Sequence, residues 1–149
     1  MIFTTKAEYG VRLLVELGRQ AGDAPIALKA IAESEGLPLA YLERIVALLK
    51  KAEIVESTRG AHGGYRLARE AHAISLVEIV EAMEGPLGMT ECSLHASNCG
   101  IESSCGVRAN WRRINDVVAH ALRAVTLADM LGPAPVEPRR SIPATLATV

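Results

Sequence analysis

Two short helical patterns joined by a tight turn, with a glycine-rich hairpin directly after them, limit what this chain can fold into. Apolar residues recur at helical spacing over about 28–35 and again over about 39–52, and Gly36 lies between the two stretches. Strand-like stretches follow at 54–57 and 65–67, joined by a glycine-rich loop. Two helices joined in this way form a helix-turn-helix, and a hairpin placed after them makes a wing. The sequence therefore predicts a winged helix-turn-helix.

Further helical patterns flank this unit. Thr5 and Glu8 have the spacing of a capping box, in which a hydroxyl and a carboxylate each accept from a backbone N–H at a helix start. This pair predicts a first helix over about 5–21. A second capping box opens a helix over about 75–84. We therefore expect residues 1–84 to form one winged helix-turn-helix domain.

Small or apolar residues then recur in alternating steps of four and three over about 106–131. The members of this seam are Val107, Trp111, Ile114, Val118, Ala121, Val125 and Ala128. A heptad seam sustained over three repeats is typical of a helix that packs against a twin. The expected fold class is mainly α with a small β-hairpin wing, ending in a long dimerisation helix of a homodimer. The stretch 132–149 contains four prolines and is expected to be disordered.

Composition restricts the classes of function. The formal net charge is −1, so bulk charge does not indicate nucleic acid as a partner. The sequence has no apolar run long enough to span a bilayer and no signal peptide, which predicts a cytoplasmic protein with no membrane partner. It contains no phosphate-binding glycine loop, no metalloprotease motif and no nucleophile with a recognisable base, so we do not expect an enzyme.

Binding of double-stranded DNA is predicted from the local placement of side chains. The second helix of a helix-turn-helix fits the major groove, where residues near its N-terminus reach base edges. The candidate readers are Tyr41, Glu43 and Arg44 on that helix and Arg59, Gly60 and His62 on the wing. Glu43 can accept from a cytosine amino group, Arg44 can reach a guanine or a phosphate, and Arg59 suits a narrow minor groove. The alternative is a winged helix that binds another protein.

The three cysteines of the chain, Cys92, Cys99 and Cys105, fall within fourteen residues. In the cytosol thiols stay reduced, and clustered cysteines are more often metal ligands or redox sensors than structural disulfides. Structural zinc usually takes close C-x2-C pairs and four ligands, which this segment lacks. Thiolates also bind iron–sulfur clusters, and a wide spacing suits such a larger group. Residues 85–105 are therefore predicted to bind a cluster, with a sensing disulfide as the alternative.

The chain resembles a known family in three stretches. The start TTKAEYGVRLLVEL, the helical stretch LPLAYLERIVALLKKAEIV and the wing STRGAHGGYRLA are similar to the Rrf family of repressors, the group that includes IscR and NsrR. The resemblance covers about residues 1–131. It implies a dimer that places two recognition helices in successive major grooves of a pseudo-palindromic operator. It also implies Tyr41, Glu43 and Arg44 as base readers and Arg59 as the wing arginine.

The resemblance also implies a cofactor. Iron–sulfur members of the family hold a cluster with three cysteines at the positions of the three cysteines here. The IscR type has a histidine three residues beyond the third cysteine, where this chain has Arg108, which has no lone pair to give. The NsrR type takes an aspartate from the partner subunit, and the matching residue here is Glu8. His95, a water or a small thiol are the other candidates. We expect 4Fe-4S in preference to 2Fe-2S.

The implied function is an iron–sulfur-sensing repressor of genes for iron–sulfur assembly, iron homeostasis or nitrosative and oxidative stress, with the cluster-assembly machinery as a further partner. Two alternatives stay open at this point. One is a cluster-free DNA regulator whose thiols oxidise directly. The other is a metal-binding adaptor that does not bind DNA.

Overall fold

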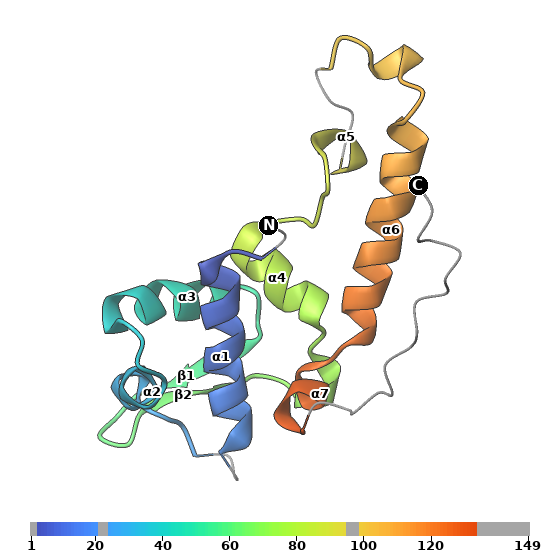
Figure 1. Ribbon diagram of the computed structural model, residues 1–149. Coiled ribbons are helices and arrows are strands. Elements are labelled where there is room, and N and C mark those ends of the chain that lie inside the picture. The colour runs from blue at the N-terminus through green and yellow to red at the C-terminus, as the bar shows by residue number, and fades with distance from the viewer. Residues whose placement is uncertain (1–2, 21–23, 95–98, 134–149) are drawn as a thin grey trace.

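The computed structural model describes residues 3–20, 24–94 and 99–133. Its helices are α1 (Thr5–Arg19), α2 (Leu28–Glu35), α3 (Leu39–Lys51), α4 (Leu76–Glu84), α5 (Glu91–Leu94), α6 (Arg108–Ala124) and α7 (Leu127–Leu131). Two short 3-10 helices lie at Ala71–Ala73 and Glu102–Ser104. Strands β1 (Val55–Thr58) and β2 (Gly64–Leu67) form an antiparallel hairpin. The prediction of a mainly α fold with a small β-hairpin wing is confirmed (Figure 1).

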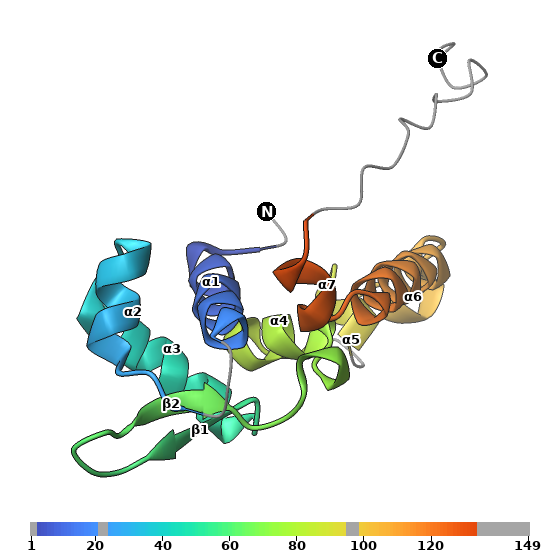
Figure 2. The same ribbon diagram turned by 90° about the horizontal axis from the view of Figure 1, so that it is seen from below.

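One aliphatic core joins the winged unit to the helices around it. Helix α1 packs against both α3 and α4, and α3 packs against α4. Leu13 and Leu14 of α1, Leu42 and Ile45 of α3 and Ile79 of α4 are buried. Burial of each such side chain stabilises the fold by about 1.5–3 kcal/mol. Figure 2 shows the result, with α2, α3 and the hairpin on one side of α1 and α4, and α6 on the other.

The helix-turn-helix has the predicted geometry. Helix α2 ends at Gly36, whose φ of 64° is a left-handed conformation that glycine adopts without steric cost. The Gly36 N–H bonds to the carbonyl of Ala32, and the N–H of Leu37 bonds to the same carbonyl at 2.9 Å. Leu37 is buried, and α3 begins at Leu39. This tight turn places α3 across α2 with its first residues facing outward.

The wing is attached to the rest of the fold through its second strand. The backbones of Ile26 and Tyr65 exchange hydrogen bonds of 2.9 and 2.8 Å, so the segment before α2 pairs with β2. A Cβ on Gly64 would lie 2.4 Å from the backbone of Ile26. Only glycine allows this approach, which explains one of the glycines of the wing. Strand β1 begins and ends one residue later than expected, and β2 begins one residue earlier and ends where expected.

Helix α1 begins differently from the prediction. The N-cap is Thr4, whose hydroxyl oxygen accepts from the N–H of Lys6 at 3.2 Å, while Thr5 is already the first helical residue. The predicted capping box of Thr5 with Glu8 is therefore wrong. Thr4 is the N-cap because its backbone is extended, with φ −86° and ψ 166°, as an N-cap residue requires. The Thr4 hydroxyl also donates to Glu84 of α4. Glu8 is left with an exposed carboxylate.

The second capping box is confirmed. The Ser75 hydroxyl accepts from the N–H of Glu78 at 3.4 Å, and the Glu78 carboxylate accepts from the Ser75 N–H at 2.9 Å. Arg69 donates to the same carboxylate at 3.0 Å. Burial raises the pKa of Glu78, but the hydrogen bonds from Ser75 and Arg69 outweigh it and hold that pKa below its ordinary value.

The long helix expected over 106–131 is divided in two. Helix α6 ends at Ala124, Val125 is extended, and Thr126 opens α7 with a capping box to Asp129. The break is stabilised by pairing with the segment before α4, because Leu76 donates to the carbonyl of Val125 at 2.8 Å and Leu127 to that of Ile74 at 2.8 Å. Leu127 is fully buried as a result. The heptad seam masked this break, although the Thr126–Asp129 spacing indicated it.

Two further expectations concern membranes and the tail. Among the helices of the described part of the chain, none has both the length and the hydropathy of a bilayer span. The tail expected to be disordered lies outside the described residues from 134 onward, and so does His95.

Candidate DNA-reading surface and cysteine segment

Helix α3 separates a buried side from an exposed side. Leu42, Ile45 and Val46 are buried, whereas Glu43 and Arg44 are exposed one turn from the start of the helix. These two positions are where a recognition helix meets base edges. The structure therefore leaves both predicted readers accessible to DNA.

Tyr41, the third predicted reader on α3, is only half-exposed because it packs against α1. Its ring meets the ring of Tyr9 at a centroid distance of 5.5 Å and an interplanar angle of 88°. Such an edge-to-face pair is worth about 0.5–1.5 kcal/mol beyond the buried area. The guanidinium of Arg12 lies 5.8 Å from the Tyr9 ring centroid and bonds through Nε to the Glu35 carboxylate at 2.9 Å. Tyr41 therefore has a structural role as well as a surface position.

The wing presents the other predicted readers. Arg59, Gly60 and His62 are all exposed in the loop between β1 and β2. Lys50 was not among the predicted readers. Its Nζ lies 2.7 Å from the hydroxyl oxygen of Ser57 and so links the last turn of α3 to β1. This bond helps to set the wing relative to the recognition helix. A cation near the end of α3 was the available signal.

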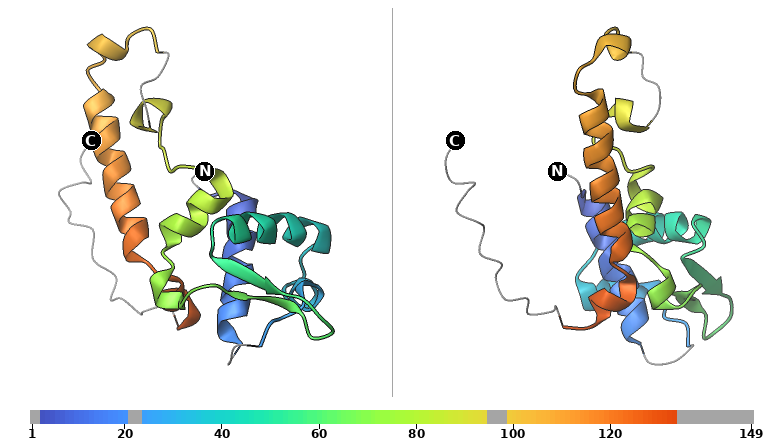
Figure 3. Two further views of the ribbon diagram at one scale, coloured as in Figure 1. Left: turned by 180° about the vertical axis from the view of Figure 1, so that it is seen from behind. Right: turned by 90° about the vertical axis from the view of Figure 1, so that its right-hand side faces the viewer.

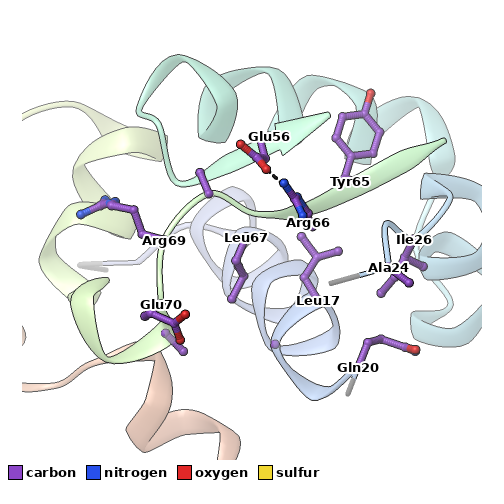
Figure 4. A pocket seen from close by; sticks show the side chains of 13 residues that line it. Leu17, Gln20, Ala24, Ile26, Glu56, Tyr65, Arg66, Leu67, Arg69 and Glu70 are labelled. Carbon is purple, nitrogen blue, oxygen red and sulfur yellow. Dashed lines mark hydrogen bonds and ion pairs between the residues drawn. The ribbon is translucent and has the colours of Figure 1, made fainter. Parts of the chain in front are cut away.

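A polar cleft of about 500 Å³ lies between the end of α1 and β2 (Figure 4). Arg66 bonds to Glu56 across the hairpin in this cleft. Arg69 bonds to the carbonyl of Ala73 at 3.1 Å and to Glu78. Both guanidinium groups of the cleft are thus engaged within the chain.

The cysteine segment is the stretch 85–105. Its helix α5 and its 3-10 helix Glu102–Ser104 lie toward the end of α6 that is far from the wing (Figures 1 and 3). Cys92 on α5 and Cys105 before α6 are half-buried, and Cys99 is exposed; none forms a disulfide. Helix α5 packs on α6, where the Nε of Arg112 donates to the carbonyl of Cys92 at 3.4 Å. The Thr90 hydroxyl oxygen lies 3.2 Å from the Cys92 sulfur.

The predicted ligands are not gathered in one place. Within residues 3–20, 24–94 and 99–133, no three side chains of the His, Cys, Asp and Glu types lie close enough to hold a metal ion. Glu8, the predicted fourth ligand, lies exposed on α1 and joins no such group in this part of the chain.

The surroundings of Cys105 were also missed by the sequence analysis. An open hollow of about 480 Å³ is lined by Cys105, Arg108, Ala109, Arg112, Arg113 and Asp116. Three cationic side chains against one carboxylate favour a negatively charged occupant. A cluster held by thiolates has that character, so the donor chemistry and the charge around it fit an iron–sulfur cluster.

Helix α6 exposes apolar side chains. Those exposed on or near it are Leu94, Ile101, Val107, Trp111, Ile114, Val117 and Val125. Trp111 is 38% exposed, Ile114 43% and Val117 64%. Exposed apolar side chains gathered along one helix are typical of an interaction surface. Trp111 and Ile114 belong to the predicted heptad seam.

The fold and the exposed face of α3 define a winged helix-turn-helix DNA-binding protein. The Rrf2 family, described as "Iron-dependent Transcriptional regulator", matches residues 3–133. The chain belongs to the Rrf2 family and is a DNA-binding transcriptional regulator, not an enzyme.

Several proteins and solved structures are similar to this chain over most of its length. Protein rrf2 of Nitratidesulfovibrio vulgaris is 33% identical over 141 residues, which cover 95% of this chain and 94% of that protein. The structure of B. subtilis CymR, described as the global cysteine regulator, has 35% identity and a TM-score of 0.71, covering 88% of this chain and 96% of that one. T. potens IscR has 35% identity and a TM-score of 0.67, covering 88% and 86%.

Proposed function

We propose that the chain is a homodimeric repressor that senses its signal through an iron–sulfur cluster held by Cys92, Cys99 and Cys105. The observation that carries this proposal is the set of three thiols outside any disulfide on one segment, of which Cys105 lines a hollow with the arginines of α6. When bound, the cluster supplies a group that changes with oxidant, nitric oxide or iron supply. Similarity to IscR supports this assignment.

The fourth ligand is proposed to be Glu8 from a second copy of the chain. Its carboxylate is exposed because Thr4, not Thr5 with Glu8, caps α1. In the described residues of a single chain Glu8 stands in no group with the cysteines, so a second copy is the natural source. A carboxylate as fourth ligand matches the NsrR type that the resemblance implies, and on that basis we propose 4Fe-4S in preference to 2Fe-2S. The alternatives His95, water or a small thiol would leave Glu8→Ala without effect on the optical spectrum.

The dimer is proposed to form through α6. Its exposed residues Trp111, Ile114 and Val117 would be covered by the same face of a second copy. Two recognition helices would then be held at one separation, which suits a pseudo-palindromic operator.

Helix α1 provides the physical path from sensor to DNA. It bears Glu8, and the next residue, Tyr9, packs on Tyr41 of the recognition helix. One turn on, Arg12 bonds to the Glu35 carboxylate at the end of α2. A displacement of α1 therefore moves both helices of the helix-turn-helix. We infer that the state of the cysteine segment shifts the population of two arrangements of the recognition helices.

A second candidate is a cluster-free regulator whose thiols react directly. Two observations favour it: the similarity to CymR, described as a global cysteine regulator, and the separation of the thiols in the described part of the chain. The exposed thiol of Cys99 is accessible to an oxidant.

Anaerobic purification decides between the two candidates. The cluster proposal predicts a brown protein with visible absorbance, matching iron and sulfide counts and a Mössbauer spectrum of the 4Fe-4S type. Cys99→Ala should abolish the colour and the response of DNA binding to nitric oxide, whereas the nearby control Ser103→Ala should keep both. A colourless protein whose DNA binding still responds to peroxide would establish the thiol regulator instead.

The DNA-binding part of the proposal has its own test. Gel shift on the chain's own promoter should give salt-sensitive, sequence-specific retardation. Absence of binding in every cluster state would leave the metal-binding adaptor.

A further inference from the structure

A shallow apolar hollow opens where the N-terminal ends of α1 and α3 meet. It measures about 510 Å³, and carbon atoms make up most of its wall. The lining residues are Thr5, Tyr9, Pro38, Ala40, Tyr41 and Arg44. Two of the predicted readers, Tyr41 and Arg44, belong to this set. The other lining residues come from α1 and from the start of α3, so the hollow depends on both helices.

The wall of the hollow is part of the packed structure. The Tyr9 and Tyr41 rings stand edge to face and pack against the buried core. The N–H of Tyr41 bonds to the carbonyl of Pro38 at 3.0 Å, which holds the first turn of α3 to the residue before it. A preformed hollow requires little ordering when a ligand enters.

The hollow lies beside the first turn of α3, the predicted recognition helix. Ala40 is exposed in the first turn of α3, the part of such a helix that reaches base edges in the major groove. Arg44, also exposed, brings a positive charge to the rim, which suits the phosphates beside a groove. Charge and position together point to DNA and not to an apolar peptide.

In the major groove, thymine alone presents an apolar group, its 5-methyl. We propose that this hollow reads the 5-methyl group of a thymine in each half of the operator, with the Ala40 methyl as its main contact. A cytosine at the same position lacks this methyl group, so its contact with the carbon-lined wall would be lost. The hollow therefore selects thymine over cytosine. This inference rests on the DNA binding of the chain and deepens it.

The experiment uses the full chain, purified anaerobically, and a duplex enriched from a random-sequence library. Each thymine of that duplex is replaced in turn by deoxyuridine, which lacks only the methyl group. One position per half-site is expected to bind about fourfold more weakly, the effect of losing one buried methyl. If deoxyuridine weakens binding at no position, the inference is overturned.

A variant of Ala40 tests whether the thymine methyl group is contacted by the hollow. In Ala40→Gly the cost of deoxyuridine at the sensitive position should fall to about onefold, because the contact is already lost. Ala47→Gly, an exposed alanine of the same helix outside the hollow, is the control and should keep the full cost. Thermal melts of both variants report on folding.

The remaining outcomes distinguish a failure of this inference from a failure of DNA binding itself. An undiminished deoxyuridine cost in Ala40→Gly means that another part of the protein reads the methyl, which overturns the inference and leaves DNA binding intact. If no duplex is enriched in any cluster state, the proposed DNA-reading function fails, and this inference fails with it.

Discussion

Tyr9 of α1 meets Tyr41 of α3 edge to face, with ring centroids 5.5 Å apart. The contact joins a helix with an exposed carboxylate at Glu8 to the helix that presents Glu43 and Arg44. Helices α1 and α3 lie apart from the 3-10 helix Glu102–Ser104 that precedes α6 (Figure 1). In the proposed mechanism, the Tyr9–Tyr41 pair is one contact through which a change in α1 reaches the recognition helix.

Removing the Tyr9 ring should lower folding stability and DNA affinity together. Tyr9→Ala is expected to cost about 1–3 kcal/mol of folding stability and to lower operator affinity, because Tyr41 loses its support. Tyr9→Phe keeps the ring and should retain both properties. Urea unfolding and fluorescence anisotropy measure the two effects. Equal affinities for wild type and Tyr9→Ala would remove the pair from the path.

A charge on the exposed face of α6 should separate the dimer. Ile114→Glu is expected to sediment as a monomer, because a carboxylate would be buried without a partner in the proposed interface. By helical spacing Arg123 lies on the opposite side of α6, so Arg123→Glu is the control and should stay dimeric. Analytical ultracentrifugation measures both. Dimerisation of Ile114→Glu at wild-type strength would place the interface elsewhere.

A methyl group on Gly64 should detach the wing. In Gly64→Ala the new Cβ would lie 2.4 Å from the backbone of Ile26, and backbone cannot give way as a flexible side chain can. We expect a loss of about 3 kcal/mol in unfolding free energy and weaker DNA binding. Gly132→Ala, where a Cβ meets nothing within 4 Å, should change little. Hydrogen exchange at Tyr65 would report the loss of pairing directly.

Glu78 should make stability depend on acid pH. Its pKa is lowered in the folded chain, so the stabilisation is fully present above the unfolded value of 4.5 and is lost as the pH falls through the folded pKa. Glu78→Gln should therefore be less stable than wild type at neutral pH, with the difference shrinking below pH 4.5. Urea unfolding across this range measures it, with the exposed Glu70→Gln as control. A difference that stays constant with pH would contradict the assignment.

Much of the fold could be predicted because local signals agree with the packing. The helical spacing over 39–52 matches the side of α3 that is buried, and Ser75 with Glu78 forms the capping box that its spacing indicates. The resemblance to the Rrf family rested on the start of the chain, the second helix of the helix-turn-helix and the wing. Such features depend on residues close together in the sequence, which a single chain displays.

The errors concern long-range competition. Thr4 displaced Thr5 as N-cap where its hydroxyl also reaches Glu84 on a distant helix. The long helix broke at Val125 because its backbone pairs with residues 74–76, some fifty positions earlier. The hollow beside Ala40 needs a wall from α1. None of these partners can be located from local spacing.

The pairing at Val125 has a mechanical consequence for the whole regulator. Two backbone hydrogen bonds of 2.8 Å join the residues just after α6 to the residues at the start of α4. If α6 were joined to α4 only by a flexible connection, a change in the tilt of α6 would not be transmitted to the recognition helix. The two bonds join the C-terminal end of α6 to α4, so we expect a rotation of α6 to carry α4 with it, together with α1, which α4 contacts through the Thr4–Glu84 hydrogen bond.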